Sequence, residues 1–163
     1  TIAIGFHSSK YRTFKDYYLY CIQTTLKPFF PKALSYSRFI SLLKSVSFPL
    51  FVLQRSLEKE SEGIAFIDST LLSVCHICRA SSHRVFKKIA RKGKTSVGWF
   101  FGLKLHLVVN HRGEVVAWML TPGNVSDLTP VETLCQKLLG KLFLDRAYIS
   151  QELFKTLYEK GLQ

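Results

Sequence analysis

Two aspartates stand in the same local context, although 77 positions separate them. Asp68 lies in the sequence Phe-Ile-Asp-Ser and Asp145 in Phe-Leu-Asp-Arg, each at the end of an apolar run. A carboxylate at the end of an apolar strand is costly to desolvate unless a cation neutralises it. If the two strands are parallel neighbours, their carboxyl ends align and the carboxylates share one site. Such hard oxygen ligands suit Mg²⁺ or Mn²⁺ better than zinc, and they support phosphodiester chemistry. The alternative is that each aspartate only caps the turn after its strand.

Positive charge is in large excess and unevenly placed. The 163 residues include 23 Lys and Arg against 11 Asp and Glu, a formal net charge of +12. Residues 69–113 carry nine Lys and Arg and no acid, whereas residues 114–163 are close to neutral. A domain this basic usually meets a polyanion, and nucleic acid is the first expectation. The 47% hydrophobic content excludes an extensively disordered chain.

The densest basic segment runs from Arg79 to Lys94, where seven Lys and Arg surround Phe86. We expect this segment to contact DNA phosphates, and a solvated loop is the alternative. Lys104 and His106 share one side of a predicted strand; they are expected to contact phosphate, or else to form a polar face at solvent. The predicted DNA-binding residues are Arg84, Lys87, Lys88, Arg91, Lys92, Lys94, Lys104 and His106.

The cysteines and tryptophans give weaker evidence of metal binding or base stacking. Only Cys75 and Cys78 of the four cysteines are close, which indicates no disulfide framework and favours a reducing compartment. These two with His83 lack a second close pair of ligands, so zinc is only weakly indicated. Trp99 and Trp118 are expected in the core rather than as platforms for stacked bases.

The elements before Gly63 are predicted to be helical. Thr13 and Asp16 form a predicted capping box, and one helix is expected to end near Leu43. A further helix is expected from about Phe48 to residue 60, with Pro49 in its first turn. Residues 1–62 are therefore predicted to form a helical region that binds DNA ends, with a recognition helix over residues 36–45. The best apolar run is too short to span a bilayer.

The pattern then changes to strands. Strands are predicted over residues 63–68, 100–109, 114–120 and 141–145, with a basic excursion over residues 71–97. Asp127 is expected to cap a helix through about Leu139, although it could also lie near the metal site. Ser150 is expected to cap the last helix, which Gly161 ends. Tyr148 is placed either beside the metal site or against that helix. Residues 63–163 are thus predicted to form an α/β domain.

Four blocks then carry a resemblance, which extends over roughly residues 5–163. They are residues 66–70, 93–106, 120–127 and 140–150, and in this order and spacing they resemble the DDE-type transposases of bacterial insertion sequences. The resemblance implies an RNase H-like core with a mixed sheet, and divalent-metal-dependent strand cleavage and strand transfer. It assigns Asp68 and Asp145 as the first two catalytic aspartates and metal ligands. Arg146 and Ala147 replace the Lys-Gly pair common in the family.

The family's third acid, a glutamate on a later helix, is expected beyond Gln163, because Glu152 and Glu159 come too soon. We therefore expect a fragment with an incomplete core that is not a competent transposase by itself. The implied partners are terminal inverted repeats and target DNA, with Mg²⁺ or Mn²⁺ as cofactor. A homodimer is one option for assembly, no membrane partner is expected, and the expected location is the bacterial cytoplasm, on the nucleoid when DNA is bound. The alternatives are a non-catalytic nucleic-acid-binding remnant and an RNase H-like nuclease.

Overall fold

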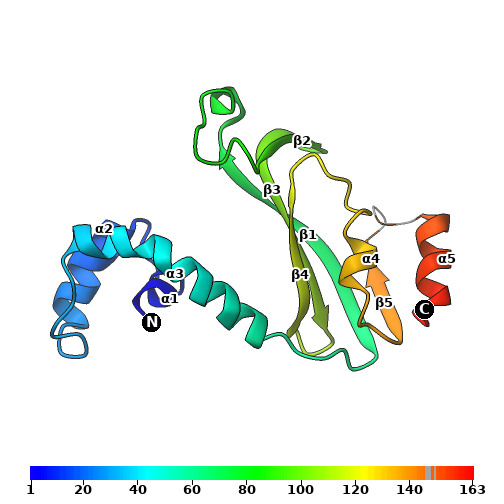
Figure 1. Ribbon diagram of the computed structural model, residues 1–163, viewed down its shortest axis with the longest axis horizontal. Coiled ribbons are helices and arrows are strands. Elements are labelled where there is room, and N and C mark those ends of the chain that lie inside the picture. The colour runs from blue at the N-terminus through cyan, green and yellow to red at the C-terminus, as the bar shows by residue number, and fades with distance from the viewer. Residues whose placement is uncertain (146–147, 149) are drawn as a thin grey trace. The chain divides into compact units, whose positions relative to one another are not determined.

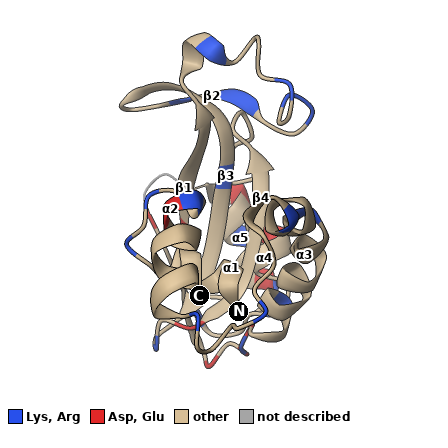
Figure 2. Cartoon of the chain, turned by 90° about the vertical axis from the view of Figure 1, so that its left-hand side faces the viewer, with Lys and Arg blue, Asp and Glu red and all other residues tan. Residues whose placement is uncertain are grey.

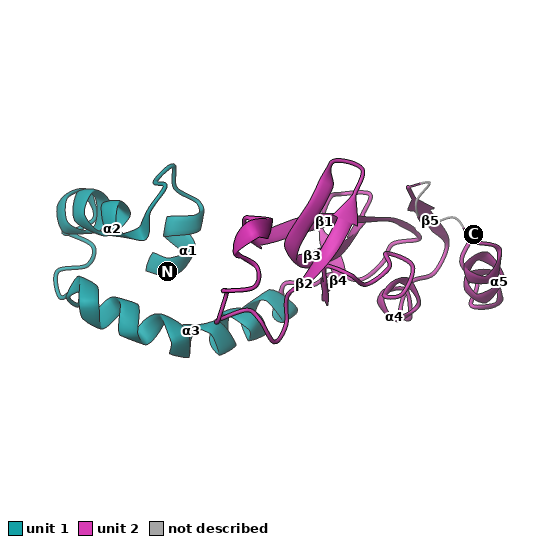
Figure 3. Ribbon diagram, turned by 90° about the horizontal axis from the view of Figure 1, so that it is seen from above, with its two compact units in different colours: residues 1–56 teal, residues 57–163 magenta. Residues whose placement is uncertain are grey.

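The computed structural model describes residues 1–145, 148 and 150–163, and the chain divides into two compact units, Thr1–Ser56 and Leu57–Gln163 (Figure 3). The sequence departure at Arg146 and Ala147 lies outside the described residues.

The first unit is helical, as predicted. It contains α1 (Ile2–His7), α2 (Phe14–Tyr17), the π-helix η1 (Tyr18–Thr25) and α3 (Tyr36–Ser56). The predicted start of α2 is confirmed: the Thr13 hydroxyl accepts the Asp16 backbone N–H at 3.2 Å and donates to the Asp16 carboxylate at 2.7 Å. Tyr17, Tyr18 and Ile22 are buried and form a small core of this unit.

Helix α3 differs from the prediction of two shorter helices. It runs unbroken for 21 residues, and Pro49 lies inside it rather than in a first turn. Proline removes one backbone donor and usually bends or breaks a helix, so the sequence signal at this position was misleading. By length and composition alone α3 could also cross a membrane, and none of its apolar window is buried. The apolar run expected to be too short, residues 48–53, is thus part of a longer helix that meets the length and composition of a membrane span.

The second unit is built on a five-stranded mixed sheet (Figure 1). Its strands are β1 (Ile64–Cys75), β2 (Arg91–Thr95), β3 (Gly98–Asn110), β4 (Val115–Pro122) and β5 (Lys141–Leu144). Strand β3 pairs antiparallel with β1, β2 and β4, whereas β1 pairs parallel with β5. The predicted combination of three antiparallel strands and one parallel strand is confirmed, and β2 is additional.

Several boundaries also differ from the sequence prediction. Strand β1 continues to Cys75 and does not end at Asp68. The predicted basic excursion contains the 3₁₀ helix η2 (Ile77–Arg79) as well as β2. The helix expected from Asp127 is only α4 (Val131–Leu134), and Pro130 occupies its N-cap position.

The final helix, α5 (Gln151–Glu159), agrees with the prediction. Its N-cap residue Ser150 accepts the Leu153 backbone N–H at 3.4 Å. Gly161 follows the helix with φ of +85°, a left-handed conformation that glycine adopts without a Cβ clash.

The two faces of the sheet are covered differently. The main core joins Ala65 and Ile67 of β1 to residues of α4 and α5, including Val131 and Leu157. On the opposite face, the rings of Phe66 and Phe143 stack with centroids 5.2 Å apart and remain 43% and 51% exposed. The parallel pair β1–β5 therefore has one packed face and one open face.

Candidate active site

Asp68 and Asp145 occupy equivalent positions on neighbouring parallel strands. The last residue pair between β1 and β5 is Ile67 with Leu144. Asp68 directly follows Ile67, and Asp145 directly follows Leu144. Phe66 and Phe143, two positions earlier, stack on the open face of the sheet. Because side chains alternate between faces along a strand, Asp68 points to this same open face. Asp145 directly follows the last residue of β5 and is exposed. Asp68 is exposed, and its Oδ1 accepts the Ser69 backbone N–H at 2.7 Å.

Tyr148 is a buried residue whose pKa is affected by the charges of both aspartates. The residue is 3% exposed and belongs to the main core together with Leu157 of α5. Burial raises the pKa of the Tyr148 phenol above its usual value of 10, and the negative charges of Asp127, Asp68 and Asp145 raise it further. Tyr148 therefore packs in the main core with α5, which is one of the two placements expected for it.

Asp127 belongs to a polar network that the sequence did not predict. Its Oδ1 accepts the Lys104 ammonium at 3.0 Å and the Ser69 hydroxyl at 3.2 Å. The Lys104 ammonium also donates to the Val125 carbonyl at 3.0 Å. Since Ser69 follows Asp68 on β1, this network holds the backbone next to that aspartate from the opposite face of the sheet. The expected N-cap role of Asp127 is wrong, because Pro130 occupies the N-cap position of α4.

Lys104 and His106 are turned into the protein. Lys104 is 9% exposed and His106 is fully buried, with its Nε2 2.8 Å from the Thr121 hydroxyl. Burial lowers the pKa of His106 below 6.5, with Asp127 raising it and Lys104 lowering it further. The alternative of a polar face at solvent is wrong for this side of β3. The inward orientation also differs from the direct DNA contact expected for these two residues.

The remaining predicted DNA-binding residues form an exposed basic surface. Figure 2 shows Lys and Arg without acidic residues around β2. Arg91 differs from the others because its Nη1 donates to the carbonyls of Lys87 at 2.9 Å, Lys88 at 3.3 Å and Ala90 at 2.9 Å. Arg91 thus also fixes the backbone of this surface. The exposed basic side chains are those of Arg84, Lys87, Lys88, Arg91, Lys92 and Lys94.

The chemistry of the two aspartates suits a hard divalent cation. Asp68 and Asp145 supply two carboxylates, and Mg²⁺ typically fills the rest of its coordination shell with water and phosphate oxygens. Among the described residues, no group of three or more His, Cys, Asp or Glu is placed to hold a metal ion. This gives no support to zinc bound by Cys75, Cys78 and His83.

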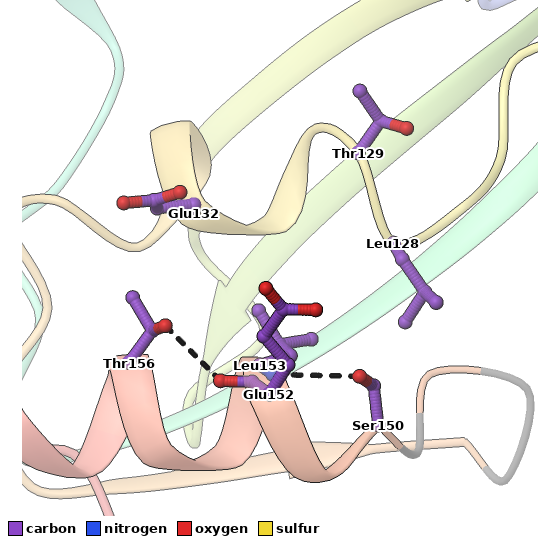
Figure 4. Close-up of a pocket in the computed structure, with 7 residues that line it drawn as sticks. All are labelled: Leu128, Thr129, Glu132, Ser150, Glu152, Leu153 and Thr156. Atoms are coloured by element: carbon purple, nitrogen blue, oxygen red, sulfur yellow. Dashed lines mark hydrogen bonds between the residues drawn. The ribbon is translucent and has the colours of Figure 1, made fainter.

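A separate hollow of about 300 Å³ lies between α5 and the segment that leads into α4 (Figure 4). Two carboxylates line it, those of Glu132 and Glu152. The Lys160 ammonium neutralises Glu132 at 2.8 Å, and neither Asp68 nor Asp145 contributes to the lining. This hollow is therefore not the aspartate site.

Comparison with known proteins agrees with this arrangement. The family model for the transposase DDE domain matches residues 58–163, which is most of the chain and contains both aspartates. No curated protein and no solved structure was found to match. The mixed sheet with its flanking helices is consistent with the RNase H-like core of such a domain. The chain belongs to the transposase DDE-domain family, and its substrate class is DNA.

Proposed function

We propose that Asp68 and Asp145 bind Mg²⁺ or Mn²⁺ and that this centre serves strand cleavage and strand transfer at the ends of an insertion sequence. The observation that carries the proposal is the shared position of the two aspartates, one residue after the pair Ile67–Leu144 on parallel strands. A bound divalent ion would stabilise charge on the phosphate oxygens and activate the attacking hydroxyl. An RNase H-like nuclease that cuts without joining would use the same centre.

The protein's own residues would position this centre. Ser69 ties Asp68 to Asp127 through its backbone N–H and its hydroxyl. Lys104 neutralises Asp127, so that a third negative charge does not compete for the cation. Burial lowers the pKa of His106, which favours a neutral imidazole within this buried network.

DNA would be held mainly by the exposed basic surface around β2. Its six side chains carry positive charge in a segment without acids, and each phosphate contact releases condensed counterions. We include in the proposal the terminal inverted repeats and target DNA as ligands, recognition of DNA ends by the first unit, a homodimer as one option for assembly, and action on the nucleoid in the bacterial cytoplasm.

Iron-mediated cleavage of the polypeptide tests where the cation binds. Fe²⁺ replaces Mg²⁺, and hydroxyl radicals made with ascorbate and peroxide cut the chain near the bound ion. We expect cuts close to Asp68 in β1 and at the end of β5, suppressed by excess Mg²⁺ and lost in Asp68→Asn and Asp145→Asn. Asp16→Asn in the other unit is the matched control and should keep the cuts. Cuts elsewhere, or cuts that survive both aspartate substitutions, would overturn the proposal and leave a non-catalytic DNA-binding module.

A further inference from the structure

The hairpin between β2 and β3 carries an exposed tryptophan. Trp99 is 62% exposed, and Val97 in the adjoining turn is 96% exposed. Strand β1 pairs with β3 only as far as Phe101, so this end of the hairpin extends beyond β1. The expectation that Trp99 belongs to the core is therefore wrong.

The next two residues on β3, Phe100 and Phe101, are buried, whereas Trp99 is not. Phe100 packs closely against Gly93 and Gly123, where an added Cβ would lie 2.6 Å and 2.8 Å from its ring. Phe101 belongs to a small core with Ala80 and Ala90. Trp99 belongs to neither group. A large aromatic ring left mainly in water marks a surface that a partner covers more often than a random surface position does.

The charge around Trp99 selects the kind of partner. Lys94 pairs with Trp99 across the hairpin, and its ammonium lies 5.9 Å from the centre of a Trp99 ring. Lys92 lies on the same side of β2, two residues earlier, and is also exposed. An aromatic ring flanked by cations, in a segment with no acid, has the composition of surfaces that stack a base and hold its neighbouring phosphates. An acidic peptide could neutralise the two lysines but has no nucleobase that could stack on the Trp99 ring.

We propose that Trp99 stacks on an unpaired nucleobase of the bound DNA, while Lys92 and Lys94 contact the phosphates next to it. This rests on the proposed function in that it takes DNA as the ligand. Trp99 precedes Leu107, the partner of Asp68, by eight residues. At about 3.3 Å per residue the stacked base lies about 26 Å along the strand from the aspartate. That distance corresponds to about eight base pairs of duplex, so the base belongs to a segment distinct from the scissile phosphate.

Tryptophan fluorescence tests the stacking directly. In Trp118→Phe the remaining indole is Trp99, and stacking on a base quenches its emission. The probes are a single-stranded oligonucleotide, a duplex with a central mismatched bubble, a perfect duplex, heparin and polyglutamate. We expect quenching by the first two that saturates together with binding, weaker quenching by the perfect duplex, and none by the two polyanions that lack bases. Should Trp118→Phe fail to fold, the emission of the wild type minus that of Trp99→Phe supplies the same signal.

Binding measurements complete the test. Trp99→Ala should weaken binding of the single strand by about 5- to 100-fold, the range for loss of one stacked base, whereas Trp99→Phe should retain most of the affinity. The salt dependence should not change, because no charge is lost. Unchanged affinity in Trp99→Ala, or equal quenching by heparin, would overturn the stacking proposal while DNA binding stands. Failure of the wild type to bind any DNA would overturn the proposed function as well.

Discussion

Lys104 and Asp127 form an ion pair with a distance of 3.0 Å between Nζ and Oδ1, and their side chains are only 11% and 27% exposed. The pair joins the middle of β3 to the loop after β4. Through the Ser69 hydroxyl on Asp127 it also reaches the residue that follows Asp68. The backbone next to Asp68 is thus held by a contact between residues on the opposite face of the sheet.

Breaking this pair should destabilise the protein more than its exposure alone suggests. Lys104→Met leaves the Asp127 carboxylate poorly solvated, and Asp127→Asn does the same to the ammonium. A double-mutant cycle by urea unfolding should give a coupling energy of about 1–3 kcal/mol. The exposed pair Lys160–Glu132 is the matched control and should couple by less than about 1 kcal/mol. Equal coupling in the two pairs would contradict the account.

His106 should make the protein less stable in mild acid. Its folded pKa is lowered below 6.5 by burial, so the unfolded chain binds the proton more readily. The stability from neutral His106 is therefore fully present above pH 6.5 and is lost as the pH falls through the folded pKa. The free energy of unfolding should fall as the pH drops below about 6.5 toward the folded pKa, and His106→Gln should reduce this fall. An unaltered pH dependence in that variant would show that other groups cause it.

Gly102 should tolerate no side chain. A Cβ at this position would lie 2.1 Å from the Leu72 carbonyl oxygen on β1, which is backbone and cannot move aside cheaply. Gly102→Ala should therefore cost about 1–3 kcal/mol in urea unfolding. Ser96→Ala, in the exposed turn of the same hairpin, should change stability by less than about 0.5 kcal/mol. A neutral Gly102→Ala would mean that β1 and β3 approach less closely than described.

The exposed lysines around β2 should set the salt dependence of DNA binding. The triple substitution of Lys87, Lys88 and Lys92 by Gln should reduce the slope of log affinity against log salt by about 0.9 for each lost phosphate contact. Arg91 is left unchanged because its guanidinium also fixes the local backbone. The control removes three exposed lysines from the near-neutral part of the chain, Lys137, Lys141 and Lys155. Equal slopes in the two triple variants would remove the assigned DNA surface.

The parallel pairing of β1 with β5 agrees with the mixed sheet that the family resemblance implied, and from the residues alone it was only a condition for the two aspartates to share a site. The sequence did not predict β2, since Arg-Lys-Gly-Lys-Thr has no apolar alternation. That strand is held by backbone pairing to β3 and by close packing of Gly93 on Gly123 and Phe100. The sequence predicts two helices in place of α3, with Pro49 in the first turn of the second, because proline usually interrupts a helix; the helix continues through Pro49.

The assignment of Asp68 and Asp145 as metal ligands stays a prediction, whereas the contacts of Asp127 were not predicted from the sequence. Asp127 follows Asn-Val-Ser and precedes a helix, which is the local pattern of an N-cap, but the helix begins only after Pro130. Its true partners, Lys104 and Ser69, lie 23 and 58 residues away, and such contacts leave no local signal. One sign was present: Lys104 and His106 alternate with leucines on a strand, which fits a buried polar pair as well as an exposed one.

Mn²⁺ affinity tests the central claim most directly, and electron paramagnetic resonance reports free Mn²⁺ during a titration of the purified chain. We predict that Asp68→Asn and Asp145→Asn each weaken binding by about tenfold or more, and that the double variant is little worse than either, because both carboxylates hold the same ion. Asp16→Asn should bind as the wild type does. Wild-type affinity in both single variants, or independent losses at two separate sites, would contradict a shared cation centre at Asp68 and Asp145.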